Sequence, residues 1–149
     1  MKYYSHPDKK LIKHLIEVRD ISIGQVPNEY EKAYEIIALC HDFGKYTSYF
    51  QNYLRDKKKS NLSNHGFISA VFSSYLGLIQ FGEENILPLI IYNTVLHHHG
   101  NIESFSTNLP IKFKDASRMN FPINVLEKID IAYEQIEDMK KNIDFIKPD

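Results

Sequence analysis

The sequence lacks most of the features that mark secreted, disulfide-bonded or membrane-spanning proteins. Cys40 is the only cysteine among 149 residues, so no disulfide and no thiolate metal site are expected. The longest apolar stretch, Ile86 to Leu96, contains Pro88 and several polar residues and is too short to span a bilayer. No charged and apolar leader opens the chain. We therefore expect a cytoplasmic protein with no membrane partner.

An excess of charge of one sign is also missing. The 18 Lys and Arg residues are balanced by 19 Asp and Glu residues, which gives a formal net charge of -1. No global basic field indicates a nucleic-acid partner, so any such contact has to be local. The length fits a single domain, residues 1–149, with a core of its own.

Alternation of apolar and polar residues over strand length is absent, and apolar residues instead recur at intervals of three and four. This period predicts an all-α domain of about six helices. We expect these helices at Asp8–Asp20, from Asn28 to about Gly44, over Tyr49–Leu54, from about Asn64 onward, at Glu84–His99 and at Ile123–Phe145.

Three further expectations concern helix packing. Asn28 and Glu31 predict a capping pair at the start of the second helix. The helix over residues 84–99 is apolar on nearly every side, which is typical of a central helix. Ile79 and Tyr133 continue the apolar stripes of their helices, so we expect both side chains to face the core.

The strongest chemical signal is a set of histidines on the inner faces or ends of four predicted helices. These are His14, His41, His65 and the run His97–His99, and Asp42 follows His41 directly. A buried imidazole is costly unless both nitrogens have partners, and a metal ion is a partner that several can share. Nitrogen and carboxylate ligands without thiolates favour an open site for Mn, Fe, Co, Ni or Zn over a closed structural zinc site.

Helix geometry limits the histidine run, because residues 97 and 99 would lie about 200° apart around a helix. Either His97 with His98 or His98 with His99 can therefore face one site. The isolated His6, near the start of the chain, is expected to be exposed and outside the metal site.

Several cations are candidates for phosphate contacts. Lys45 follows Asp42 by three residues and could meet a phosphate, although a solvated lysine that interacts with a helix dipole has the same pattern. Other lysines and an arginine form a hypothetical path for a DNA backbone, although ordinary surface cations have the same appearance. The residues of this path are Lys57, Lys58, Lys59, Lys112, Lys114 and Arg118.

The order of these residues resembles the HD nuclease domain of the CRISPR type I nuclease-helicase, within the HD phosphohydrolase superfamily. The agreement runs over about residues 5–105, and four motifs in sequence carry it. They are His14, the string His41-Asp42-Phe43-Gly44-Lys45 followed by Tyr49-Phe50-Gln51, the pair Asn64-His65 with Ser69, and His98-His99-Gly100.

The resemblance implies an all-α HD fold around two divalent metal ions, of the Mn, Ni, Co or Fe class or else Mg or Zn. It implies hydrolysis of phosphodiester bonds of single-stranded DNA in CRISPR type I interference, an antiviral defence, with Asp42 and Lys45 as catalytic residues. The implied partners are single-stranded DNA, a helicase subunit or domain and a CRISPR surveillance complex. The implied ligands are His14, His41 and Asp42 for one ion, and Asp42, His65, His98 and His99 for the other.

One family feature is missing, and it leaves alternatives open. A late aspartate in an Ala-Asp context usually completes the shell of the first ion, and no such string follows Gly100. Asp115, Asp130 and Asp144 are candidates by position only, and the ligand could equally lie beyond residue 149 or be lost. The alternative functions are an HD phosphohydrolase of nucleotides or cyclic dinucleotides, and a degenerate HD module that does not cleave. The Gly-Tyr-Pro segment typical of cyclic-dinucleotide enzymes is absent.

Overall fold

The computed structural model describes residues 3–100 and 123–143, which form six α-helices, two short 3-10 helices and one small β-hairpin. The predicted all-α class is confirmed. The elements are β1 (Tyr4–His6), β2 (Lys9–Lys10), α1 (Leu11–Ser22), α2 (Asn28–Cys40), η1 (Phe43–Tyr46), α3 (Ser48–Asp56), η2 (Asn61–Ser63), α4 (Gly66–Phe81), α5 (Leu87–Leu96) and α7 (Ile123–Asn142).

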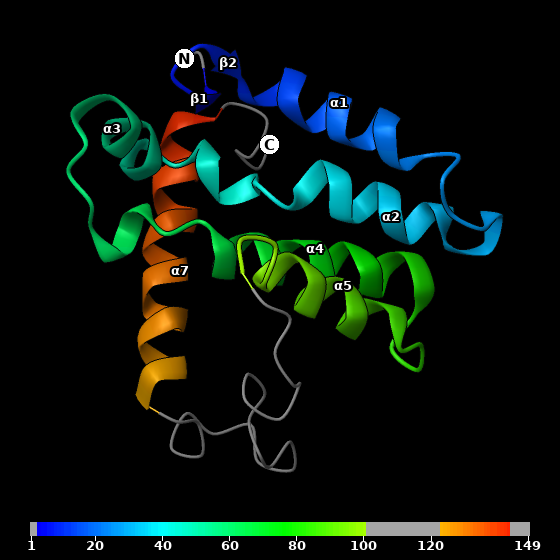
Figure 1. Ribbon diagram of the computed structural model, residues 1–149. Coiled ribbons are helices and arrows are strands. Elements are labelled where there is room, and N and C mark those ends of the chain that lie inside the picture. The colour runs from blue at the N-terminus through cyan, green and yellow to red at the C-terminus, as the bar shows by residue number, and fades with distance from the viewer. Residues whose placement is uncertain (1–2, 101–122, 144–149) are drawn as a thin grey trace.

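Two helix pairs, one crossing helix and the short helix α3 make up the architecture (Figure 1). Helix α1 packs along α2, helix α5 packs along α4, and α2 contacts both α4 and α5. Helix α7 runs steeply across these pairs and contacts α3, α4 and η2. The central helix is therefore α4, and the prediction that the helix over residues 84–99 is central is wrong. Ile90, on the outer side of α5, is 41% exposed.

The core between α4, η1 and α7 fixes the segment that follows α2. Ile68, Met139 and Ile143 are buried together there, and each such side chain contributes about 1.5–3 kcal/mol when removed from water. Phe43 of η1 packs against this cluster and stacks on Phe72 with 3.8 Å between ring centroids. The residues around Asp42 are thus anchored to two long helices.

Two residues that were predicted to face the core are exposed. Tyr133 is 64% exposed because the buried stripe of α7 runs through Ala132 and Met139 instead. Ile79 is 66% exposed. Gly77 faces α5, and a residue two positions later lies about 200° away around a helix, which turns Ile79 outward.

Several predicted boundaries were also wrong. Helix α1 begins at Leu11 because Lys9–Lys10 pairs antiparallel with Tyr4–His6 in a hairpin that the prediction lacked. Helix α2 ends at Cys40, before Gly44, so His41 and Asp42 lie in a turn.

The predicted capping pair is wrong as well. Asn28 is the first residue inside α2, and Pro27 takes the N-cap position with no side-chain hydrogen bond. Helix α5 ends at Leu96, which places the histidine run in a turn and not in a helix.

None of the described helices is both long and apolar enough to cross a bilayer. Cys40 is buried at the end of α2, and this burial raises the pKa of its thiol to about 11. The thiol therefore stays protonated at neutral pH and packs as a small apolar side chain.

Candidate metal centre

Asp42 is the centre around which the histidines gather. This residue is 1% exposed and lies in the turn between α2 and η1. One carboxylate oxygen, Oδ2, is 3.2 Å from Nε2 of His14 and 3.5 Å from Nε2 of His41. The other oxygen, Oδ1, is 3.2 Å from Nε2 of His65 and 3.4 Å from Nε2 of His98. Each oxygen therefore faces a different set of imidazoles.

These contacts define two groups of candidate metal ligands that share Asp42. Within each group the ligand atoms all lie within 4.8 Å of one another. The first group is His14, His41 and Asp42, and the second group is Asp42, His65, His98 and His99. The structure thus brings together all six residues that were predicted as ligands.

The spacing within each group suits a cation. The Nε2 atoms of His14 and His41 are 3.2 Å apart, and those of His65 and His99 are 3.0 Å apart. Bonds of about 2.0–2.1 Å from nitrogen to a zinc-like ion place neighbouring ligand atoms roughly 2.8–3.4 Å apart in octahedral or tetrahedral geometry. The ligand atoms already have the separation that one shared ion requires.

Hydrogen bonds to the backbone set the ring orientation of two of these histidines. Nδ1 of His41 lies 2.9 Å from the carbonyl oxygen of Ala38, and Nδ1 of His98 lies 2.6 Å from that of Val95. A carbonyl oxygen can only accept, so each Nδ1 carries a proton, and in the neutral form of each ring Nε2 has the lone pair and faces Asp42. This is the tautomer that binds a metal through Nε2.

Two buried polar atoms between the two ligand groups also indicate a cation site. Oδ1 of Asp42 and Nε2 of His98 are buried and have no hydrogen-bond partner among residues 3–100 and 123–143. An unsatisfied buried polar atom costs about 1–3 kcal/mol, and both atoms offer lone pairs. A cation between them would satisfy both, so the donor set fits a divalent ion.

Electrostatics keep these ligands in their metal-binding protonation states. Burial alone would raise the pKa of Asp42, but the neighbouring His65, His98 and Lys45 side chains hold it well below its usual range. Burial lowers the pKa of His14, His41 and His65. At neutral pH the carboxylate is therefore charged and these imidazoles are neutral.

A glycine allows α4 to approach Asp42 closely. A Cβ atom at Gly44 would lie 2.6 Å from Cγ2 of Ile68 and 2.7 Å from the backbone oxygen of His65. The backbone N–H of Gly44 also donates a 2.9 Å hydrogen bond to Oγ of Ser69. Only a residue without a side chain lets η1 and the start of α4 meet here and brings His65 to Asp42.

Lys45 is buried, with 4% of its surface exposed, so the interpretation as a solvated helix-end lysine is wrong. Its Nζ atom lies 2.8 Å from Oδ2 of Asp42 and 5.3 Å from the centre of the Phe50 ring. His97 caps α5 and belongs to neither ligand group. The second group thus contains the pair His98 and His99.

The other predicted residues lie apart from the centre. Lys57, Lys58 and Lys59 are exposed, and none of them lines the pocket over Asp42. Asp130 is exposed on α7 and belongs to neither ligand group. Outside the described residues are Lys112, Lys114, Arg118, Asp115 and Asp144.

Two glutamines that support the centre were not assigned a role from the sequence. Gln135 of α7 is 1% exposed, and its amide donates to the backbone oxygens of Leu62 and Asn64, just before His65. Gln51 of α3 donates to the backbone oxygens of Tyr4 and Lys45. The signal for Gln135 is an amide within the apolar stripe of α7, but its partners lie more than 70 residues away.

A pocket of about 480 Å³ opens onto Lys45 and onto residues of both ligand groups. Its walls come mainly from α1 and α2, so a ligand of moderate size can reach Asp42 between these helices. Its lining residues are His6, His14, Val18, Ser22, Tyr34, Ile37, Ala38, His41, Asp42, Lys45, His98 and His99.

Known proteins share this pattern. A sequence profile of the HD domain family matches residues 11–142. The chain is 27% identical over 136 residues to the CRISPR-associated endonuclease Cas3-HD of Methanocaldococcus jannaschii, and the alignment covers 90% of this chain and 53% of that protein. The chain thus spans about half the length of this relative. No solved structure gives a significant match.

Proposed function

The chain belongs to the HD domain family, a family of metal-dependent hydrolases, and on this basis we propose that it is a nuclease that hydrolyses phosphodiester bonds of single-stranded DNA. We propose further that it acts in the cytoplasm, in CRISPR type I interference, together with a helicase and a surveillance complex. The similarity to a CRISPR-associated endonuclease supports this choice over the hydrolysis of free nucleotides.

The observation that carries the proposal is the carboxylate of Asp42, shared by two sets of imidazoles. His14, His41 and Asp42 would hold one divalent ion, and Asp42, His65, His98 and His99 would hold a second. Two such ions, when bound, lower the pKa of water and stabilise charge on the attacking and leaving oxygens of a phosphodiester. The absence of a thiolate nucleophile at the centre favours direct in-line displacement by water.

Lys45 contributes a fixed positive charge to this centre. Its ammonium group is paired with Oδ2 of Asp42. A cation bound by Asp42 would compete for that oxygen, and the ammonium group would then be available to a phosphate oxygen near the same place. Neutralising charge that develops in the transition state is the role that such a preorganised cation serves.

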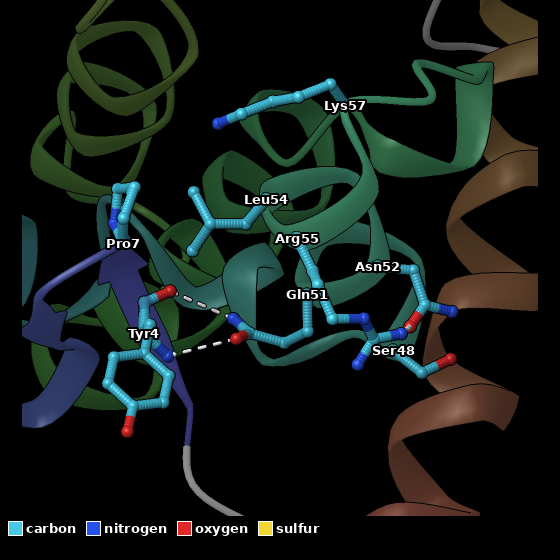
Figure 2. A pocket seen from close by; sticks show the side chains of 8 residues that line it. All are labelled: Tyr4, Pro7, Ser48, Gln51, Asn52, Leu54, Arg55 and Lys57. Carbon is cyan, nitrogen blue, oxygen red and sulfur yellow. Dashed lines mark hydrogen bonds between the residues drawn. The ribbon is translucent and has the colours of Figure 1, made fainter.

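The cations that we propose as contacts for the DNA strand lie apart from the metal centre. Lys57 lines a groove of about 510 Å³ between the β-hairpin and α3, together with Arg55 (Figure 2). Lys59 lines a separate pocket with Lys128. We propose that these cations contact the phosphates that flank the cleaved bond, which predicts binding that weakens as salt is added.

The experiment that tests the function measures bound metal per chain and cleavage of single-stranded DNA, with a duplex and a free nucleotide as competing substrates. Two ions and DNA cleavage are expected for the wild type. Asp42→Ala should lose both ions and reduce cleavage by at least about 10²–10³-fold, the scale of one lost preorganised electrostatic contact. The matched control is Asp20→Ala, at an exposed aspartate of α1 that should not matter.

Two other outcomes would support one of the alternative functions. Metal binding with hydrolysis of the nucleotide alone would replace the nuclease by a small-molecule phosphohydrolase. A wild-type chain without metal and without cleavage would mean a module that does not catalyse. Because Asp42→Ala leaves the buried Lys45 without its partner, circular dichroism should first establish that the variant is folded.

A further inference from the structure

The first ligand group is less complete than the second. It offers three ligand atoms from the described chain, whereas the second group offers four. The first group also lies at the pocket of about 480 Å³, where one more side chain is within reach of it. That side chain is His6, which belongs to β1 and not to any helix.

His6 lies against the first group much as the ligands lie against one another. Its ring packs edge-on against that of His14, with 5.7 Å between centroids and an interplanar angle of 86°. The rings of His14 and His41 have the same edge-on arrangement, with 5.2 Å between centroids. His6 is exposed and lines the same pocket as both of them.

A hydrogen bond to Nδ1 also orients His6, although its partner is a serine hydroxyl and not a backbone carbonyl as in His41 and His98. Oγ of Ser5 donates its one proton to the backbone oxygen of Lys9 at 3.3 Å. Nδ1 of His6 lies 3.2 Å from this Oγ, so Nδ1 is the donor and Oγ accepts. In the neutral form of the ring, Nε2 of His6 then has the lone pair, and it makes no hydrogen bond within the described residues.

Hydrogen bonds connect the hairpin that carries His6 to the segment of Lys45 beside the metal centre. Figure 2 shows Tyr4 of β1 and Gln51 of α3 joined by two hydrogen bonds, of 3.0 and 2.9 Å. The same Gln51 amide donates to the backbone oxygen of Lys45 at 2.8 Å. A two-stranded hairpin is only marginally stable by itself, so these contacts fix the position of His6.

We infer that His6 is a further ligand of the first metal ion and takes the place of the late aspartate. The inference rests on the proposed two-ion function. Nε2 of His6 is not among the atoms of the first group that lie within 4.8 Å of one another. The inference therefore includes an approach of the His6 ring to His14 and Asp42 when an ion binds.

The test compares the full chain with His6→Asn, whose amide can still donate to Ser5 but has no atom at the place of Nε2. Co²⁺ is added to metal-free protein, calorimetry gives the affinity of each ion, and proton NMR counts the shifted N–H signals of bound imidazoles. The expected result is one N–H signal fewer and at least about a tenfold weaker affinity for one of the two ions. The other ion should be unaffected.

Asp8→Ala, at an exposed residue of the hairpin turn, is the matched control and should keep both affinities. The inference is overturned if His6→Asn keeps every N–H signal and both affinities, or if Asp8→Ala causes the same loss. In either case two ions and DNA cleavage in the wild type would leave the proposed function standing. A wild-type chain that binds no Co²⁺ would overturn both.

Discussion

The two ligand groups that share Asp42 differ in how firmly the fold holds them. The second group lies at the start of α4 and just after α5, two helices that pack along each other, and α7 supports the segment before His65 through Gln135. The first group depends on His14 of α1, which packs on α2 and the β-hairpin at one side of the molecule. We therefore expect the second ion to be bound more tightly than the first.

The largest expected effect comes from separating the two groups by mutation. His65→Ala should abolish binding of the second ion, leave the first and reduce cleavage by at least about 10²–10³-fold. His14→Ala should instead affect only the first ion. Titration with Mn²⁺ checks both, and if either variant lost both ions equally, the two groups would not be separate sites.

The histidine spacing made much of this centre predictable, because helical periods place His14 and His65 on inner faces whatever the exact helix ends. The turn at residues 97–99 was not predictable, since a run of identical residues has no period. The β-hairpin was missed because strands of three and two residues are too short to show alternation.

Contacts between segments that are distant in the chain could not be predicted from the sequence either. Gln135 lies in a helical stripe, and nothing local indicates that its amide reaches Leu62 and Asn64. The importance of Gly44 was apparent only through the resemblance of its motif, and the structure supplies the reason in its contact with His65.

The second-largest effect concerns the close contact of Gly44 with Ile68 and the backbone of His65. Gly44→Ala should destabilise the protein by about 1–3 kcal/mol, because the new methyl group overlaps Ile68 and the backbone of His65. It should weaken the second ion more than the first. Urea denaturation measures the loss, and Gly100→Ala is the control, since a Cβ atom there meets nothing within 4 Å. Equal stability of the two variants would contradict the close approach.

A smaller effect is expected from the support behind the second group. Gln135→Met keeps the volume but removes two hydrogen bonds, which leaves two carbonyl oxygens without this partner at a cost of about 1–3 kcal/mol. The second ion should be bound about 10–100-fold more weakly, as for other residues that orient metal ligands. Calorimetry measures this, and Gln80→Met, at an exposed position of α4, should change nothing.

The smallest expected effect is the response of the metal-free protein to pH. Burial lowers the pKa of His14, His41 and His65 below the ordinary value of about 6.5, so the unfolded chain takes up protons more readily than the folded one. Stability should be constant above about pH 6.5 and fall as the pH drops toward the lowered pKa values. Urea midpoints at pH 7.5 and 5.5 in a chelator check this, and a higher midpoint at the lower pH would contradict it.

The pairing of Asp42 with Lys45 has a consequence for binding equilibria. The Asp42 carboxylate and the Lys45 ammonium group cancel in charge, so two divalent ions would bring an uncompensated charge of about +4 to the centre. A polyanion supplies the missing counter-charge, so metal and nucleic acid should each raise the affinity for the other by the same factor. Such reciprocity would leave the centre sparsely loaded at low metal concentration until a strand arrives.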